Sequence, residues 1–108
     1  MNNELDKFPS FDDLLVEEFK NDASLAKETI AEELAEYEKT GDIRYLLMTL
    51  NLVAKAKGWT QLEKETGLSR PTLYSVLSGK SIPKIDTLQR ILKALGFGIS
   101  FYKLKSAS

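Results

Sequence analysis

One segment near the middle of the chain decides the predicted fold: residues Thr60–Gly79 read TQLEKETGLSRPTLYSVLSG. The T-x-x-E pattern from Thr60 to Glu63 predicts a capping box at the start of a short helix. Gly67 ends that helix at a turn that needs a positive φ, which glycine adopts without strain. Ser69 then predicts the N-cap of a second short helix. The segment therefore predicts two short helices joined by a tight turn, the helix-turn-helix unit.

The second of these helices separates apolar from polar residues. Its predicted inward residues, Leu73, Val76 and Leu77, stand three and four apart. Its outward side carries arginine and hydroxyl groups, which can hydrogen bond to base edges in the major groove of DNA. Helix-start N–H groups and nearby lysines can hold phosphates. The DNA-binding residues predicted on this helix and in the loop after it are Ser69, Arg70, Pro71, Thr72, Tyr74, Ser75, Lys80 and Lys84. The alternative is an αα-hairpin within a helical bundle, without any DNA contact.

Working outward, apolar periodicity and capping residues predict four further helices, at about 10–21, 23–39, 43–57 and 84–95. Ser10 with Asp13 predicts another capping box. The run Ile99–Leu104, which follows Gly98, predicts a short β-strand. The expected fold is an all-α bundle of about six short helices with this helix-turn-helix and a short C-terminal β-strand. We expect an acidic helical arm at 1–42, a DNA-binding domain at 43–97 and a strand or tail at 98–108.

The net charge of −1 conceals a division along the chain. Residues 1–42 hold 13 acidic and 4 basic side chains, a net charge of −9, whereas residues 43–108 hold 11 basic and 3 acidic ones, a net charge of +8. A basic half suits the phosphates of nucleic acid, and an acidic half suits a basic protein. Two surfaces with different partners are therefore expected, unless both are solvated faces whose charges pair with each other.

The chain has no histidine and no cysteine. Most acid–base catalysis, the catalytic triads and most zinc sites depend on these residues. We therefore expect no enzyme, no cofactor and no metal site; catalysis by paired carboxylates, such as Glu17 with Glu18 or Glu32 with Glu36, is the alternative ranked last. The sequence has no apolar stretch of membrane-spanning length and no signal peptide, so a cytoplasmic protein is expected.

At this point the sequence resembles a known family. Residues 62–79, with TLQRILKALG at 87–96, look like the Xre/Cro-type helix-turn-helix domain. The stretch QLEKETGLSR at 61–70 and the ending KALGF at 93–97 look more closely like the addiction-module antidote proteins, the HigA-like antitoxins of toxin–antitoxin pairs. The resemblance extends over most of the chain. It departs at Glu63, where such motifs usually have a small residue.

The resemblance implies a recognition helix from Ser69 to Leu77, with its N-terminal outward residues facing bases and Thr60 and Gln61 approaching the DNA backbone. It also implies an antitoxin of a type II module, which represses its own operon and neutralises a ribonuclease-like toxin by protein contact. A stand-alone repressor without a toxin partner is the alternative. The base-facing prediction rests most on Arg70, Thr72 and Ser75.

Two further parts of the chain have candidate roles. An acidic helix face is the candidate toxin contact, with a solvated face as the alternative; its residues are Glu28, Glu32, Glu33 and Glu36. Because readers of this type usually act as dimers, the predicted C-terminal strand could pair with its twin in a homodimer. It could instead fold onto its own core against Trp59 or Phe97. Trp59 itself is expected in the core rather than stacked on a base.

Overall fold

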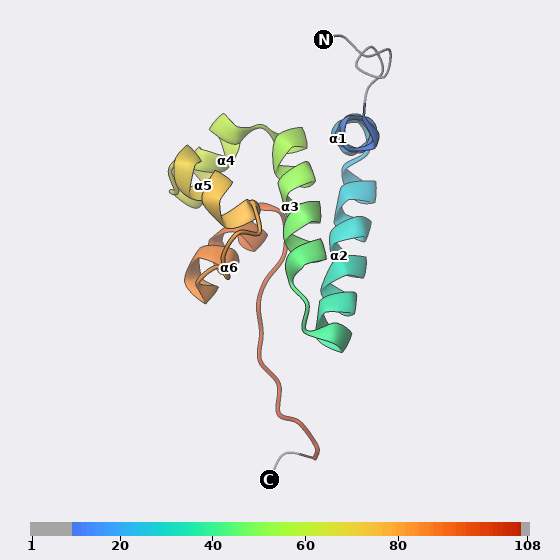
Figure 1. Cartoon of the computed structure of the whole chain (residues 1–108), viewed down its shortest axis with the longest axis vertical. Helices are drawn as coiled ribbons and strands as arrows, with labels where there is room; N and C mark the ends of the chain where they lie inside the picture. Colours follow the sequence, from blue (N-terminus) through green and yellow to red (C-terminus); the bar gives the residue numbers. More distant parts are fainter. Residues whose placement is uncertain (1–9, 107–108) are drawn as a thin grey trace.

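The structure, a computed structural model, describes residues 10–106. The beginning of the predicted acidic arm, residues 1–9, lies outside the described residues. Six α-helices follow one another along the described chain (Figure 1). They are α1 (Phe11–Asn21), α2 (Ala23–Thr40), α3 (Arg44–Lys57), α4 (Trp59–Thr66), α5 (Arg70–Leu77) and α6 (Ile85–Ala94). The predicted all-α bundle of about six helices is confirmed.

Helix α3 occupies the centre of the bundle. It packs against α1 and α2 on one side and against α4 and α5 on the other, and α6 packs against α4 (Figure 1). The largest fully buried side chains join both sides into one core. They are Ile30, Leu46, Leu47, Leu50, Leu62, Leu73, Ile91 and Leu92. The helices of the predicted acidic arm therefore share their core with the rest of the described chain.

Local sequence signals set most of the helix boundaries. Ser10 and Asp13 form the predicted reciprocal capping box at the start of α1. The Asp22 carboxylate accepts two backbone N–H bonds at the start of α2. Gly41 ends α2 in the left-handed conformation, with φ 73°. These short polar and glycine signals divide the chain into helices short enough to pack around α3.

The predicted capping box at Thr60 is wrong. Helix α4 begins one residue earlier, at Trp59, and its N-cap is Gly58, which has φ 99° and also ends α3. Thr60 is therefore already inside the first helical turn, where its side chain does not cap the helix. This frees the side chain of Glu63 to reach across the following turn to Arg70.

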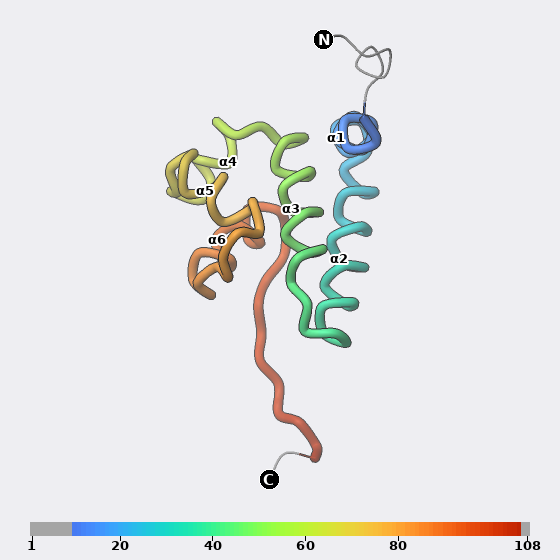
Figure 2. The backbone as a smooth tube through the Cα atoms, viewed as in Figure 1, coloured from blue at the N-terminus to red at the C-terminus, as the bar shows by residue number. Residues whose placement is uncertain are grey.

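The predicted C-terminal β-strand is also wrong. Among residues 10–106 there is no strand, and the segment after Gly96 is a single extended chain that passes α3 and continues beyond the end of α2 (Figure 2). Ile99 still packs against the edge of the core, but Phe101 is 84% exposed. A strand needs a neighbour to accept and donate its backbone hydrogen bonds, and the described chain supplies none beside this segment. The alternation and β-propensity of Ile99–Leu104 were therefore not enough to predict a strand.

Candidate nucleic-acid interface

The turn between α4 and α5 is fixed by its own side chains. Gly67 adopts φ 72° at the end of α4. The Thr66 hydroxyl, which is buried, donates to the carbonyl of Leu62 at 2.7 Å and accepts from the N–H of Leu68 at 3.1 Å. Ser69 then accepts from the N–H of Thr72 and caps α5. Helices α4 and α5 with this turn, residues 59–77, are referred to below as the α4–α5 unit.

Helix α5 presents two different sides. Leu73 and Leu77 are buried and Val76 is half-buried, as the sequence predicted for its inward side. Of the predicted outward residues, Arg70 is half-buried and the other four are exposed. The exposed ones are Pro71, Thr72, Tyr74 and Ser75. The hydroxyl groups of Ser69 and Thr72 lie 2.9 Å apart at the start of the helix. The exposed side of α5 thus carries hydroxyl groups, a proline and an aromatic ring, and it has no carboxylate.

Arg70 is held inside the α4–α5 unit. Its Nε donates to Oε1 of Glu63 at 3.0 Å, and its Nη2 donates to the hydroxyl of Thr60 at 2.8 Å. The two partners lie on α4, so the guanidinium bridges the turn. In the sequence, Glu63 stood out as part of a predicted capping box and as a departure from the family pattern. Its pairing with Arg70, seven residues on, was missed because that spacing has no meaning until the turn geometry is known.

The aromatic side chains of the unit also pack on each other. The rings of Trp59 and Tyr74 meet edge-to-face with centroids 4.7 Å apart. Trp59 is half-buried against the core, which agrees with its predicted core role, while Tyr74 stays 47% exposed. An edge-to-face pair of this kind fixes both rings beyond what burial alone provides. Tyr74 is therefore positioned on the outward side by a contact that its own helix does not supply.

Gln61 belongs to a chain of contacts on the other side of α4. Its amide donates to Glu65, and Glu65 also forms an ion pair with Lys57 at 2.8 Å. The hydrogen bond from Lys57, followed by that from Gln61, lowers the pKa of the Glu65 carboxyl. Lys57 also donates to the carbonyl of Ala94 at the end of α6. The chain of contacts joins α3, α4 and α6.

The two predicted phosphate-binding lysines follow α5. Lys80 lies in the exposed turn after it, and Lys84 occupies the N-cap position of α6, also exposed. Neither ammonium group forms an ion pair with a residue between 10 and 106. Both charges are therefore available to an anion from outside the described chain.

The acidic helix face lies elsewhere. Glu28, Glu32 and Glu36, spaced by four residues, are exposed on α2, and Glu33 is half-buried. Helices α2 and α5 lie on opposite sides of α3 (Figure 1). At the end of α2, Glu38 accepts a hydrogen bond from the hydroxyl of Tyr102, which raises the pKa of that phenol. The charge division seen in the sequence thus places acidic residues and the α5 surface on separate faces.

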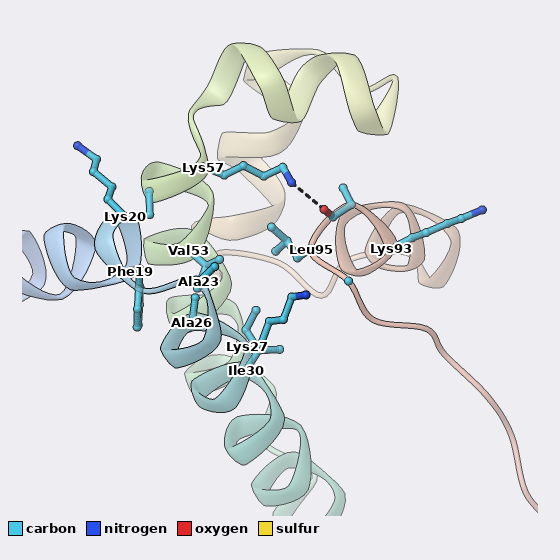
Figure 3. Close-up of a pocket in the computed structure, with 13 residues that line it drawn as sticks. Phe19, Lys20, Ala23, Ala26, Lys27, Ile30, Val53, Lys57, Lys93 and Leu95 are labelled. Atoms are coloured by element: carbon cyan, nitrogen blue, oxygen red, sulfur yellow. Dashed lines mark hydrogen bonds between the residues drawn. The ribbon is translucent and has the colours of Figure 1, made fainter.

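A groove of about 410 Å³ lies where α1 and α2 approach the end of α6 (Figure 3). Ile30, Val53 and Leu95 contribute apolar lining, and Lys57 crosses to Ala94 on one side. The side chains of Lys20 and Lys93 extend away from it in Figure 3.

No group of acidic residues that could hold a metal ion occurs among residues 10–106. No helix in this part of the chain is long and apolar enough to cross a membrane.

Comparison with known proteins decides the family. A family model described as "Probable addiction module antidote protein" matches residues 16–103, which include all of the α4–α5 unit and most of the arm. The chain belongs to this antidote family. An uncharacterized protein of Haemophilus influenzae is 33% identical over 70 residues, covering 65% of this chain and 72% of that protein. No solved structure matches the chain. Membership in the antidote family gives the chain a toxin as its expected partner.

Proposed function

We propose that this chain is a DNA-binding antitoxin of a type II toxin–antitoxin module. In this proposal the α4–α5 unit is a helix-turn-helix of the Xre/Cro type, and the protein belongs to the HigA-like antitoxins. Acting as a cytoplasmic homodimer, it represses its own operon and neutralises a ribonuclease-like toxin by protein contact. The observation that carries the proposal is the division of α5 into a buried apolar side and an exposed side of hydroxyl and aromatic groups next to Arg70.

The chemistry of the exposed side supports DNA reading. A helix whose N-terminal turns expose short polar side chains can enter the major groove and bond to base edges. Lys80, in the turn after α5, and Lys84, at the start of α6, are exposed and can neutralise phosphates. An αα-hairpin that served only packing would have no need of this composition.

Paired substitutions test the DNA part of the proposal. Arg70→Ala should reduce discrimination at one base pair, whereas Lys80→Ala should weaken binding to every duplex and reduce the magnitude of the salt slope by about 1. Binding is measured by fluorescence anisotropy with a duplex from upstream of the gene and a scrambled duplex, each at several salt concentrations. Equal effects of both substitutions on both duplexes would contradict the assigned roles.

The acidic face of α2 is the proposed toxin contact. Its exposed glutamates can attract a small basic ribonuclease and cover its RNA-binding surface. Reversing the charge of Glu32 and Glu36 should therefore weaken neutralisation of the toxin while DNA binding stays unchanged, because α2 and α5 lie on opposite sides of α3. Co-expression of each variant with the protein encoded beside it, scored by cell growth, makes the comparison. Unimpaired growth with the reversed variant would remove this face from the proposal.

A further inference from the structure

Arg70 and Glu63 form a contact whose purpose a packing role does not explain. The pair is an ion pair at 3.0 Å between side chains that are 40% and 35% exposed, so it lies at the surface of the α4–α5 unit. A surface ion pair contributes little to stability. Glu63 is also one of only three carboxylates in residues 43–108, and it lies beside the surface assigned to DNA. A negative charge there would repel phosphates unless it were neutralised.

The two bonds made by the Arg70 guanidinium determine which of its N–H groups remain for a DNA base. Nε and Nη2 lie on the same edge of the group, and both are used by α4, through Glu63 and Thr60. No bond to a residue between 10 and 106 involves the Nη1 N–H groups. The end of the guanidinium formed by Nη1 and the second N–H of Nη2 is therefore unoccupied by the described chain. That end is one that can bond to O6 and N7 of guanine together.

We propose that Glu63 is a positioning residue that sets the base specificity of Arg70, an inference that rests on the proposed function. Glu63 and Thr60 hold one edge of the guanidinium so that the opposite end points outward for guanine. A side chain fixed before binding loses less rotamer freedom when it meets the base, so the correct base pair gains affinity. Because the pair is locally neutral, Glu63 does not oppose the phosphates nearby.

The test compares Glu63→Gln with the matched control Asp86→Asn. Both substitutions remove one negative charge from the basic part of the chain, but Asp86 forms no ion pair with residues 10–106. The full-length wild type is first used to select preferred sites from a randomised duplex library, which defines the position at which Arg70→Ala loses its base preference. Dissociation constants are then measured for the selected duplex and for duplexes changed at that position only.

Opposite changes in two quantities are expected for Glu63→Gln. Discrimination at the Arg70 position should fall about fivefold or more, since a bidentate arginine–guanine pair accounts for roughly 5- to 150-fold. Affinity for non-cognate duplexes should rise, because the positive charge of Arg70 is then no longer neutralised. Asp86→Asn should give the second change without the first. Thr60→Val, which removes the other bond to Arg70, should lower discrimination at the same position by a smaller factor.

Three outcomes decide the matter. Glu63→Gln with the wild-type base preference would overturn this inference while the proposed function stands. A loss of preference at every position, shared by Thr60→Val and accompanied by a lower melting temperature, would also overturn it, since the pair would then only maintain the fold. Wild-type protein that selects no sequence and shows no salt-dependent binding would overturn the proposed function itself, and this inference with it.

Discussion

Gly67 offers the sharpest test of how the α4–α5 unit is built. Its φ of 72° lies in the left-handed region, and a Cβ added there would meet no atom within 4 Å. Gly67→Ala therefore creates strain without any clash. The left-handed conformation costs an L-residue about 1–2 kcal/mol. Alanine recovers about 0.4–1 kcal/mol by restricting the unfolded chain. The expected net loss is about 1 kcal/mol in the free energy of unfolding.

The assay is thermal and urea unfolding followed by circular dichroism. For a chain of this size, a loss of about 1 kcal/mol lowers the melting temperature by roughly 4–8 °C. Gly98→Ala is the matched control, because Gly98 has no positive φ and equally open surroundings. It should leave the melting temperature almost unchanged. Gly67→Asn should fall between the two, since asparagine tolerates the left-handed region better than alanine. Equal stability of Gly67→Ala and wild type would refute the reasoning.

Two further predictions concern titration. The Arg44 guanidinium bonds to Asp42 and lowers the pKa of that carboxyl to about 2, so the stability it contributes is present above the unfolded pKa of about 3.8 and is lost as the pH falls toward 2. The melting temperatures of wild type and Asp42→Asn should therefore converge over that interval; a constant difference down to pH 2 would contradict this. Glu38 raises the pKa of Tyr102, so this contact stabilises the protein below pH 10 and is lost as the pH rises through the higher folded value. In an absorbance titration at 295 nm, Glu38→Gln should lower the pKa of one tyrosine, and an unchanged titration curve would contradict the contact.

The helices could be predicted from the sequence because their signals are local. The capping box at Ser10, the left-handed Gly67 and the N-cap at Ser69 each act within a few residues, and the structure has all three. The apolar spacing of α5 likewise identified Leu73 as buried. Signals of this kind depend on backbone geometry that the neighbouring residues themselves determine.

The errors arose where the outcome depends on partners distant in sequence or absent. Thr60 and Glu63 match the capping-box pattern, but α4 begins earlier, with Gly58 as its N-cap. The side chains of Thr60 and Glu63 accept hydrogen bonds from Arg70 instead. Ile99–Leu104 alternates as a strand would, yet a strand forms only beside another strand. Secondary-structure propensity shows which structure a segment can form, whereas its contacts with other segments decide whether that structure forms.

The central claim is that the α4–α5 unit reads DNA, and one measurement tests it most directly. Purified full-length protein is titrated against a labelled duplex from immediately upstream of its own reading frame and against a scrambled duplex, between 50 and 200 mM salt. We expect a protected site in footprinting, tighter binding to the upstream duplex, and affinity for both duplexes that falls steeply with salt. No salt-dependent binding to either duplex, even at the lowest salt concentration, would contradict the claim.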